Sequence, residues 1–134
     1  MSKRHSPRFL AAVEAAKARI DEIDVGGTVA GLAGDAPPVL VDVREAQEWA
    51  RGHAAGAVHL SKGVLERDVE AAFPDPDTPL VLYCGGGFRS ALSADALQAM
   101  GYRRVWSLAG GWRAWCAADA PVTTPSRASR EPNG

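Results

Sequence analysis

The apolar positions of this chain fall into short runs that alternate with stretches of helical periodicity. Runs rich in Val and Leu predict four strands, at residues 39–43, 57–60, 80–83 and 104–108. Each run is followed by a segment of helical composition, at residues 45–51, 64–73, 90–100 and 110–118. Strands that alternate with helices of about ten residues are typical of an α/β fold, in which a mainly parallel sheet carries helices on both faces.

The two ends of the chain follow different patterns. Near the N-terminus, apolar residues at helical spacing predict an amphipathic helix that lies on the domain surface or binds a partner: Phe9, Leu10, Val13, Ala16 and Ile20. We expect Gly26 and Gly27 to break this helix and Thr28 to cap a short helix that runs to residue 33. The Pro-, Ser- and Arg-rich residues 123–134 are expected to be disordered.

Composition and charge narrow the class of protein. The 134 residues are 46% hydrophobic and 23% charged, which suits one compact soluble domain. The net charge of -1, with both signs interspersed, predicts binding to neither nucleic acid nor an acidic membrane surface. Residues 9–23 carry several charges where a signal peptide needs an apolar core, and no apolar run reaches membrane-spanning length. We therefore expect a cytoplasmic protein.

The segment that carries chemistry lies at residues 83–90, where the third apolar run meets a helix. It contains a cysteine, three glycines, a phenylalanine, an arginine and a serine: Cys84, Gly85, Gly86, Gly87, Phe88, Arg89 and Ser90. A cysteine attacks as its thiolate, and the free N–H groups of a helix N-terminus stabilise that charge. Successive glycines let several N–H groups turn toward one anion. The pattern predicts an anion-binding loop around a nucleophilic cysteine.

Other interpretations of this loop remain open at the level of residues alone. Cys84 could be an inert core residue beside a flexible turn, or a redox thiol. Arg89 either contributes charge to the loop or ties it to a carboxylate. Four residues separate Cys84 from Arg89, whereas cysteine-dependent phosphatases use five, so the spacing favours a smaller anion or a single extra sulfur atom.

Three segments together resemble the rhodanese family of sulfurtransferases. The loop matches the family pattern Cys-x-x-Gly-x-Arg-Ser, and residues 39–60 are similar to its DVRE…E[FW]…GHIxGAxxIP signature. Residues 106–122 are similar to its LxGGxxAWxxxGxPV ending. The resemblance covers about residues 35–122 and implies a central, mainly parallel five-stranded sheet with helices on both faces, here with an extra N-terminal helix. We therefore divide the chain into a flexible N-terminus (1–8), a helical extension (9–34), a rhodanese domain (35–122) and a disordered tail (123–134).

The resemblance implies a function for the loop. Cys84 is expected to take a sulfane sulfur from a donor such as thiosulfate and to pass it, as a persulfide held by the N–H groups of residues 85–90, to a thiol or cyanide. This chemistry requires no general base and no cofactor. Several rhodaneses carry a basic side chain just after the cysteine, whereas Gly85 and Gly86 offer only backbone, so a persulfidated protein or a small thiol is an alternative partner. A regulatory module that carries sulfur for a protein partner, or binds one, is the alternative function.

Residues outside the loop have two interpretations each. Asp42 is expected either to support the loop by accepting its hydrogen bonds or to hold the next turn. Arg44 is either a substrate contact or the partner of Glu48 in a helix pair. His53, between two small residues in a turn, is expected to fix that turn rather than to move protons. The tryptophans are expected in the core or the pocket wall.

The remaining candidates carry little chemistry. Cys116 follows two tryptophans on the last predicted helix and is interpreted as a small apolar filler of the core. A bridge between Cys84 and Cys116 is disfavoured in a chain without a secretion signal. The histidines and cysteines share no spacing typical of metal ligands, and neither common nucleotide-binding glycine motif is present.

Overall fold

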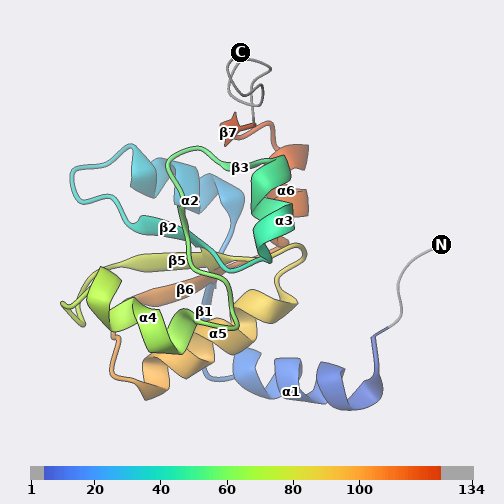
Figure 1. The fold of residues 1–134 in the computed structure, drawn as a ribbon. Coiled ribbons are helices and arrows are strands. Elements are labelled where there is room, and N and C mark those ends of the chain that lie inside the picture. Colours follow the sequence, from blue (N-terminus) through green and yellow to red (C-terminus); the bar gives the residue numbers. More distant parts are fainter. Residues whose placement is uncertain (1–4, 125–134) are drawn as a thin grey trace.

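The computed structural model describes residues 5–124, in which helices and strands alternate along most of the chain (Figure 1). The helices are α1 (Pro7–Lys17), α2 (Val25–Leu32), α3 (Ala46–Arg51), α4 (Leu65–Ala72), α5 (Phe88–Ala99) and α6 (Gly111–Ala117). The strands are β1 (Asp21–Ile23), β2 (Val39–Asp42), β3 (His53–Ala54), β4 (Val58–His59), β5 (Leu80–Tyr83), β6 (Val105–Leu108) and β7 (Val122–Thr123). The four predicted strands and the helices after them are present, with ends that differ by no more than two residues.

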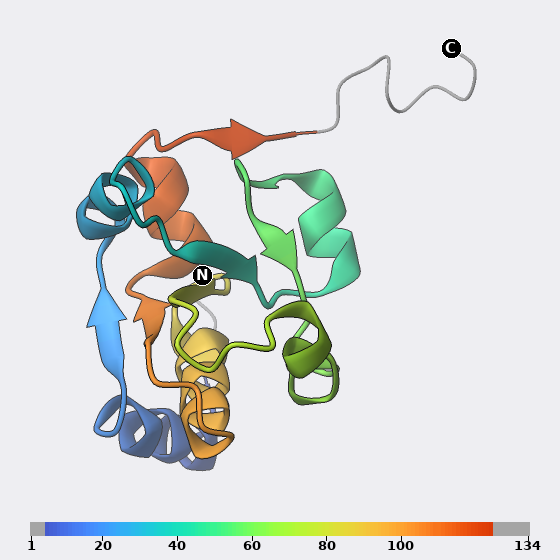
Figure 2. The ribbon, with the colours of Figure 1, turned by 90° about the vertical axis from the view of Figure 1, so that its left-hand side faces the viewer.

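Five strands form the central sheet, in the order β1-β6-β5-β2-β4, and all neighbouring pairs are parallel. Strand β5 lies in the middle, between β2 and β6. Helices cover both faces of this sheet, as the view along it shows (Figure 2). The predicted α/β class and five-stranded sheet are therefore confirmed.

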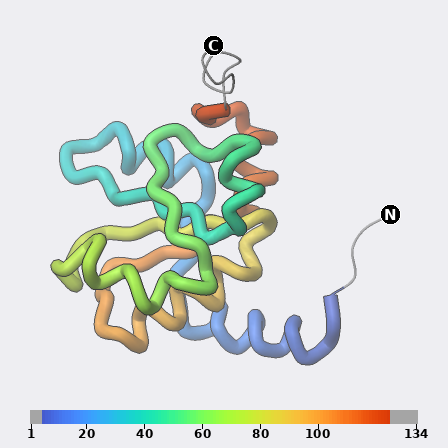
Figure 3. The backbone as a smooth tube through the Cα atoms, in the orientation of Figure 1, coloured from blue at the N-terminus to red at the C-terminus, as the bar shows by residue number. Residues whose placement is uncertain are grey.

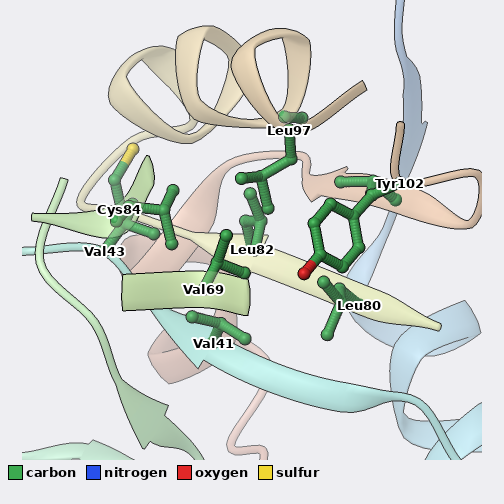
Figure 4. Packing of buried hydrophobic residues seen from close by; sticks show 11 residues of the cluster. Val41, Val43, Val69, Leu80, Leu82, Cys84, Leu97 and Tyr102 are labelled. Carbon is green, nitrogen blue, oxygen red and sulfur yellow. The ribbon is translucent and has the colours of Figure 1, made fainter. Parts of the chain in front are cut away.

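The alternation of side chains along β5 divides the core into two clusters. Leu80 and Leu82 face α4 and α5, where they pack with Val69 and Leu97. Cys84 belongs to the same cluster and lies beyond Leu82, at the end that leads to the loop (Figure 4). On the opposite face are Val81 and Tyr83, which pack with Val25 of α2 and Trp115 of α6. All four residues of β5 are fully buried, because helices cover both sides of a parallel sheet.

The N-terminal region differs from its prediction in three ways. Residues 21–23 form an edge strand of the sheet, β1, which the sequence pattern did not indicate. Gly26 and Gly27 do not break a helix; they lie in the first turn of α2. Asp24, not Thr28, caps α2 by accepting a hydrogen bond from the Gly27 N–H at 2.7 Å, while the Thr28 side chain is buried. The boundary between a helical extension and the domain stays a prediction.

The predicted N-terminal helix is present as α1, but it begins at Pro7, within the predicted flexible N-terminus, and ends at Lys17, so Ile20 lies outside it. It lies along the outer side of α5, as the backbone tube shows (Figure 3). Arg19, just after α1, pairs with Asp95 of α5 at 2.7 Å. The same region places Phe9 beside Phe88, the first residue of α5, with ring centroids 6.2 Å apart. Helix α1 therefore approaches the Cys84 loop.

Near the C-terminus, β7 pairs antiparallel with β3 and includes Thr123, the first residue of the predicted disordered tail. The rest of that tail, from residue 125, lies outside the described residues, as do residues 1–4. Cys116 is exposed rather than in the core, so its interpretation as an apolar filler was wrong. Within residues 5–124, both cysteines are free, and none of the helices has the length and apolar character needed to cross a membrane.

Candidate active site around Cys84

Cys84 directly follows β5, at the carboxyl end of the central strand. The neighbouring strands β2 and β6 end at the same edge of the sheet, because all three are parallel and in register. Loops after adjacent parallel strands meet at such an edge, which is where open α/β folds place their ligands. The side chain of Cys84 is only 1% exposed, so the sulfur lies in the floor of the site.

Backbone N–H groups surround the Cys84 sulfur. Gly87 donates to Sγ at 3.1 Å and Ser90 donates at 3.3 Å, both from the start of α5. The Ser90 hydroxyl lies 3.5 Å from Sγ and 2.8 Å from the hydroxyl of Ser107 on β6, and both serines are buried. Because these donors converge on one atom, they stabilise a negative charge on the sulfur.

Two glycines give this loop its shape. Gly87 has a φ of 99°, a left-handed conformation that side chains rarely adopt, and a Cβ there would lie 3.3 Å from the Gly110 nitrogen. Gly111 has a φ of 55°, and a Cβ there would overlap the carbonyl oxygen of Cys84. Each glycine therefore permits the close approach of the Cys84 loop and the start of α6.

The start of α6 holds the loop by its backbone. Trp112 donates its N–H to the Cys84 carbonyl at 2.7 Å, and Arg113 donates its N–H to the Gly85 carbonyl at 3.1 Å. These bonds satisfy two N–H groups that the first turn of a helix leaves without an internal partner. The loop therefore lies between the starts of two helices, α5 and α6.

Arg89 ties the loop to a carboxylate, one of the two interpretations of its role. Its guanidinium makes two hydrogen bonds to Glu48 of α3, at 3.0 and 3.2 Å. The hydrogen bonds from Arg89 hold the pKa of Glu48 below its usual value, so the carboxylate is charged at neutral pH. The positive charge of Arg89 is therefore largely balanced.

Arg44 does not pair with Glu48, so that prediction was wrong. Arg44 precedes α3 and its guanidinium bonds Asp42 at 2.7 Å and the Gly52 carbonyl at 2.7 Å. It also lies over the Trp112 ring, 4.6 Å from the centroid. Arg44 is 3% exposed and does not line the cavity at Cys84, so the structure gives no support to its role as a substrate contact.

Asp42 holds the turn after β2, the second of its two predicted roles. One of its carboxylate oxygens accepts the Arg44 N–H at 2.8 Å, and the other accepts the Tyr83 hydroxyl at 2.7 Å. Burial raises the pKa of Tyr83 far above its usual range, so its hydroxyl remains a donor. Asp42 thus contacts the residue before Cys84, and no bond from residues 85–90 to its carboxylate is found in the described chain.

His53 bonds within its turn, as the sequence predicted. Its Nδ1 lies 3.1 Å from the Trp49 carbonyl, and its ring stacks on the Trp49 ring with centroids 3.4 Å apart. Trp115 is fully buried, whereas Trp106 and Trp112 are half-buried against the core. Within residues 5–124, no group of three or more His, Cys, Asp or Glu side chains is placed to bind a metal.

A cavity of about 730 Å³ opens above Cys84. Five of the predicted site residues line it: Cys84, Gly85, Gly86, Phe88 and Arg89. The lining also includes His5, Ser6, Phe9, Glu48 and Arg113. Of these additional residues, Arg113 alone carried a sequence signal, since it follows the carboxyl end of β6, a strand beside β5. No sequence pattern placed His5 and Phe9 near the loop, yet both line the cavity.

Two solved structures share this architecture. A protein of unknown function and possible tyrosine phosphatase from Rhodopseudomonas palustris superposes with a TM-score of 0.79 and 29% identity, over 92% of this chain and 99% of its own. The polysulfide-sulfur transferase homodimer of Wolinella succinogenes superposes with a TM-score of 0.76 and 28% identity, over 90% of each chain.

Sequence comparison agrees with the fold. The thiosulfate sulfurtransferase GlpE of Haemophilus influenzae is 36% identical over 86 residues, which are 64% of this chain and 80% of the relative. The family model described as the rhodanese-like domain matches residues 27–118, which include β2, the Cys84 loop and α6. With the cysteine, the glycines and the sheet edge all in place, this chain belongs to the rhodanese-like domain family.

Proposed function

We propose that the protein is a sulfurtransferase in which Cys84 carries the transferred sulfur as a persulfide. The observation that supports this most directly is the convergence of the Gly87 and Ser90 N–H groups on Sγ at the floor of an open cavity. Those donors favour an anionic sulfur, which is the attacking form of cysteine. The cavity gives a donor molecule access to that sulfur.

The first half of the reaction forms the persulfide. The Cys84 thiolate attacks the outer sulfur of thiosulfate and forms a new S–S bond. The S–S bond within thiosulfate breaks, and sulfite leaves with the bonding electron pair. The charge then lies on the outer persulfide sulfur, beside the backbone of residues 85–90, whose N–H groups stabilise it.

The second half of the reaction returns the enzyme to its thiolate. An acceptor thiolate attacks the outer sulfur, the Cys84 S–S bond breaks, and the sulfur leaves as an acceptor persulfide. Cyanide as the acceptor gives thiocyanate in the same way. No proton must move in either half, because both the attacking and the leaving groups are anions, so the mechanism requires no general base.

The names of the relatives and the size of the cavity indicate which molecules exchange sulfur with Cys84. Thiosulfate is favoured because related sulfurtransferases are named for it. A persulfidated protein as the donor, or a small thiol as the acceptor, also suits the cavity, which is larger than thiosulfate requires. A cytoplasmic location stays a prediction from the sequence.

Mass spectrometry and a matched pair of cysteine variants test the function. After incubation with thiosulfate, the protein should gain one sulfur atom on the peptide that contains Cys84. Cys84→Ser should abolish both this gain and the formation of thiocyanate from cyanide. Cys116→Ser is the control and should retain both, because Cys116 is exposed near the end of α6 and does not line the cavity above Cys84. Full activity in Cys84→Ser would overturn the mechanism.

A phosphatase is the second candidate that a specific observation raises, since one structural neighbour is described as a possible tyrosine phosphatase. In this chain, the loop arginine is paired with Glu48, and the cysteine-to-arginine spacing is shorter than in cysteine-dependent phosphatases. We expect no phosphate release from an aryl phosphate. Release that depends on Cys84 would favour the phosphatase instead.

A further inference from the structure

The cavity above Cys84 is too large for an inorganic donor alone. Its volume is about 730 Å³, which is in the range of sites that bind organic molecules. A five-atom anion such as thiosulfate fills on the order of 150 Å³, if each of its atoms takes the volume of one water molecule. Most of the cavity is therefore available to a larger sulfur carrier.

The outer wall of this cavity is aromatic. His5 and Phe88 make an edge-to-face contact with centroids 4.9 Å apart, and Phe9 lies 5.3 Å from His5. His5 and Phe9 come from the N-terminal segment, outside the matched family domain, and Phe88 comes from the Cys84 loop. Aromatic rings in this arrangement offer a surface that favours a second aromatic or apolar group.

Among the described residues that line the cavity, Arg113 is the arginine that can bind an anion. Of the charged side chains in the lining, Arg89 and Glu48 neutralise each other. Arg113 is exposed, and among the described residues no carboxylate pairs with it. Its guanidinium lies over the loop, where a Cβ added to Gly86 would be 3.4 Å from its Nη1 atom. Arg113 therefore supplies the charge that the side chain after the cysteine does not.

We propose that Arg113 and the aromatic wall of His5, Phe9 and Phe88 together bind a sulfur carrier that has one anionic group and an apolar, preferably aromatic, body. The inference rests on the proposed function, because it assigns the donor class of the same site. An aromatic thiosulfonate has this chemistry. Its outer sulfur is attacked by the Cys84 thiolate, its S–S bond breaks, and the sulfinate leaves with the bonding electron pair, so Cys84 becomes the persulfide as before.

Three donors and two variants test the assignment, with cyanide as the acceptor. The donors are thiosulfate, methanethiosulfonate and benzenethiosulfonate, of which only the last has an aromatic body. Arg113→Gln should raise KM for all three by about five- to tenfold, with the loss in KM rather than in kcat, because the charge acts on binding. Phe9→Ala should lower the preference for benzenethiosulfonate over methanethiosulfonate by about threefold or more, the size of one lost aromatic contact.

Matched variants control for general effects of substitution. Arg104→Gln removes an exposed arginine outside the cavity, and Leu10→Ala shortens the exposed neighbour of Phe9, which does not line this cavity. The ratio of activities with benzenethiosulfonate and methanethiosulfonate is compared between variants. The intrinsic reactivity of each donor is the same in every variant and therefore cancels from this comparison. The assignment is overturned if Arg113→Gln behaves as Arg104→Gln does, or if Phe9→Ala leaves the preference as Leu10→Ala does. Failure of every donor to form a persulfide on Cys84 would instead overturn the proposed function.

Discussion

Two arginine–carboxylate pairs lie close to the candidate active site and differ in their surroundings. Arg44 and Asp42 are both nearly inaccessible, with side chains 4% and 0% exposed. Arg89 and Glu48 are both partly accessible, with side chains 33% and 29% exposed. The Arg44 side chain makes three hydrogen bonds to Asp42, at 2.7 to 3.1 Å, and Arg89 makes two to Glu48, at 3.0 and 3.2 Å. Both guanidinium groups thus make more than one hydrogen bond to their carboxylate, and the larger difference between the pairs is their burial.

Burial decides what each pair contributes. Burial alone would lower the pKa of Arg44, but the hydrogen bonds and charge of Asp42 outweigh it and keep the pKa above its usual value. Removal of one partner would leave a buried charge without its counter-ion, so the loss of the Arg44 pair should lower the stability of the fold strongly. The Arg89 pair is partly solvated, so its loss costs little stability and mainly changes the charge of the cavity.

The largest expected effect is on the buried pair. Asp42→Asn should lower the free energy of unfolding by about 3–5 kcal/mol, because it leaves the Arg44 charge buried and unpaired. Urea unfolding at neutral pH measures this loss. Asp77→Asn, at the exposed pair with Arg103, is the control and should change stability little. A similarly small loss in Asp42→Asn would contradict the distinction between the two pairs.

A smaller loss is expected from the hydroxyl that connects the buried pair to β5. Tyr83→Phe removes the donor to Asp42 and the acceptor for the Ala54 N–H, both within a buried network. The free energy of unfolding should fall by about 1–3 kcal/mol. Tyr102→Phe is the control, since its hydroxyl makes one hydrogen bond, to the Phe73 carbonyl, and it should cost less. Equal losses in the two variants would argue against a special role for the Asp42 network.

The half-exposed pair should respond in function rather than in stability. Glu48→Gln removes a negative charge from the cavity and leaves Arg89 free to attract an anion. We expect KM for thiosulfate to fall about threefold, the effect of one partly screened charge, while unfolding changes by less than about 1 kcal/mol. Steady-state kinetics measures the first and urea unfolding the second. A rise in KM would show that the pair serves mainly to position the loop.

The smallest expected effect is the pH dependence of the stability that the Glu48–Arg89 pair contributes. The pKa of Glu48 is lowered in the folded state, mainly by its hydrogen bonds from Arg89, relative to an ordinary value of 4.5. The contribution of the pair to stability is therefore complete above pH 4.5 and is lost as the pH falls through the lowered folded value. The difference in unfolding free energy between the wild type and Glu48→Gln should be constant from about pH 6 to 8 and shrink in acid. If this difference in unfolding free energy already shrinks near neutral pH, a group other than Glu48 is responsible for it.

The central part of the fold could be predicted because its signals are local. A buried parallel strand such as β5 is a continuous apolar run, and Cys84 with its glycines marks the turn at its end. β1 was missed because Asp21 and Glu22 are exposed at the sheet edge and carry no apolar pattern. Asp24 rather than Thr28 caps α2, because the Asp24 carboxylate accepts a hydrogen bond from the Gly27 N–H.

The partners of the arginines could not be predicted for a different reason. Helical spacing favoured a local pair of Arg44 with Glu48, but Arg44 lies before α3 and turns back to Asp42. Glu48 instead meets Arg89, which is 41 residues further along the chain. The contribution of His5 and Phe9 to the cavity is equally non-local, because it depends on how α1 packs against α5. Contacts between distant segments leave no mark on local composition.

Backbone bonds from Trp112 and Arg113 connect the start of α6 to the Cys84 loop. These two segments, which are distant in sequence, can therefore be transferred to another protein only together. A graft of residues 84–90 into another member of the family would depend on that protein's own helix start for the N–H groups that bond the Cys84 and Gly85 carbonyls. It would also separate the sulfur from Arg113, since the same residue bonds the loop and lines the cavity. The transplantable unit of this protein is therefore the pair of turns after β5 and β6, not the cysteine loop alone.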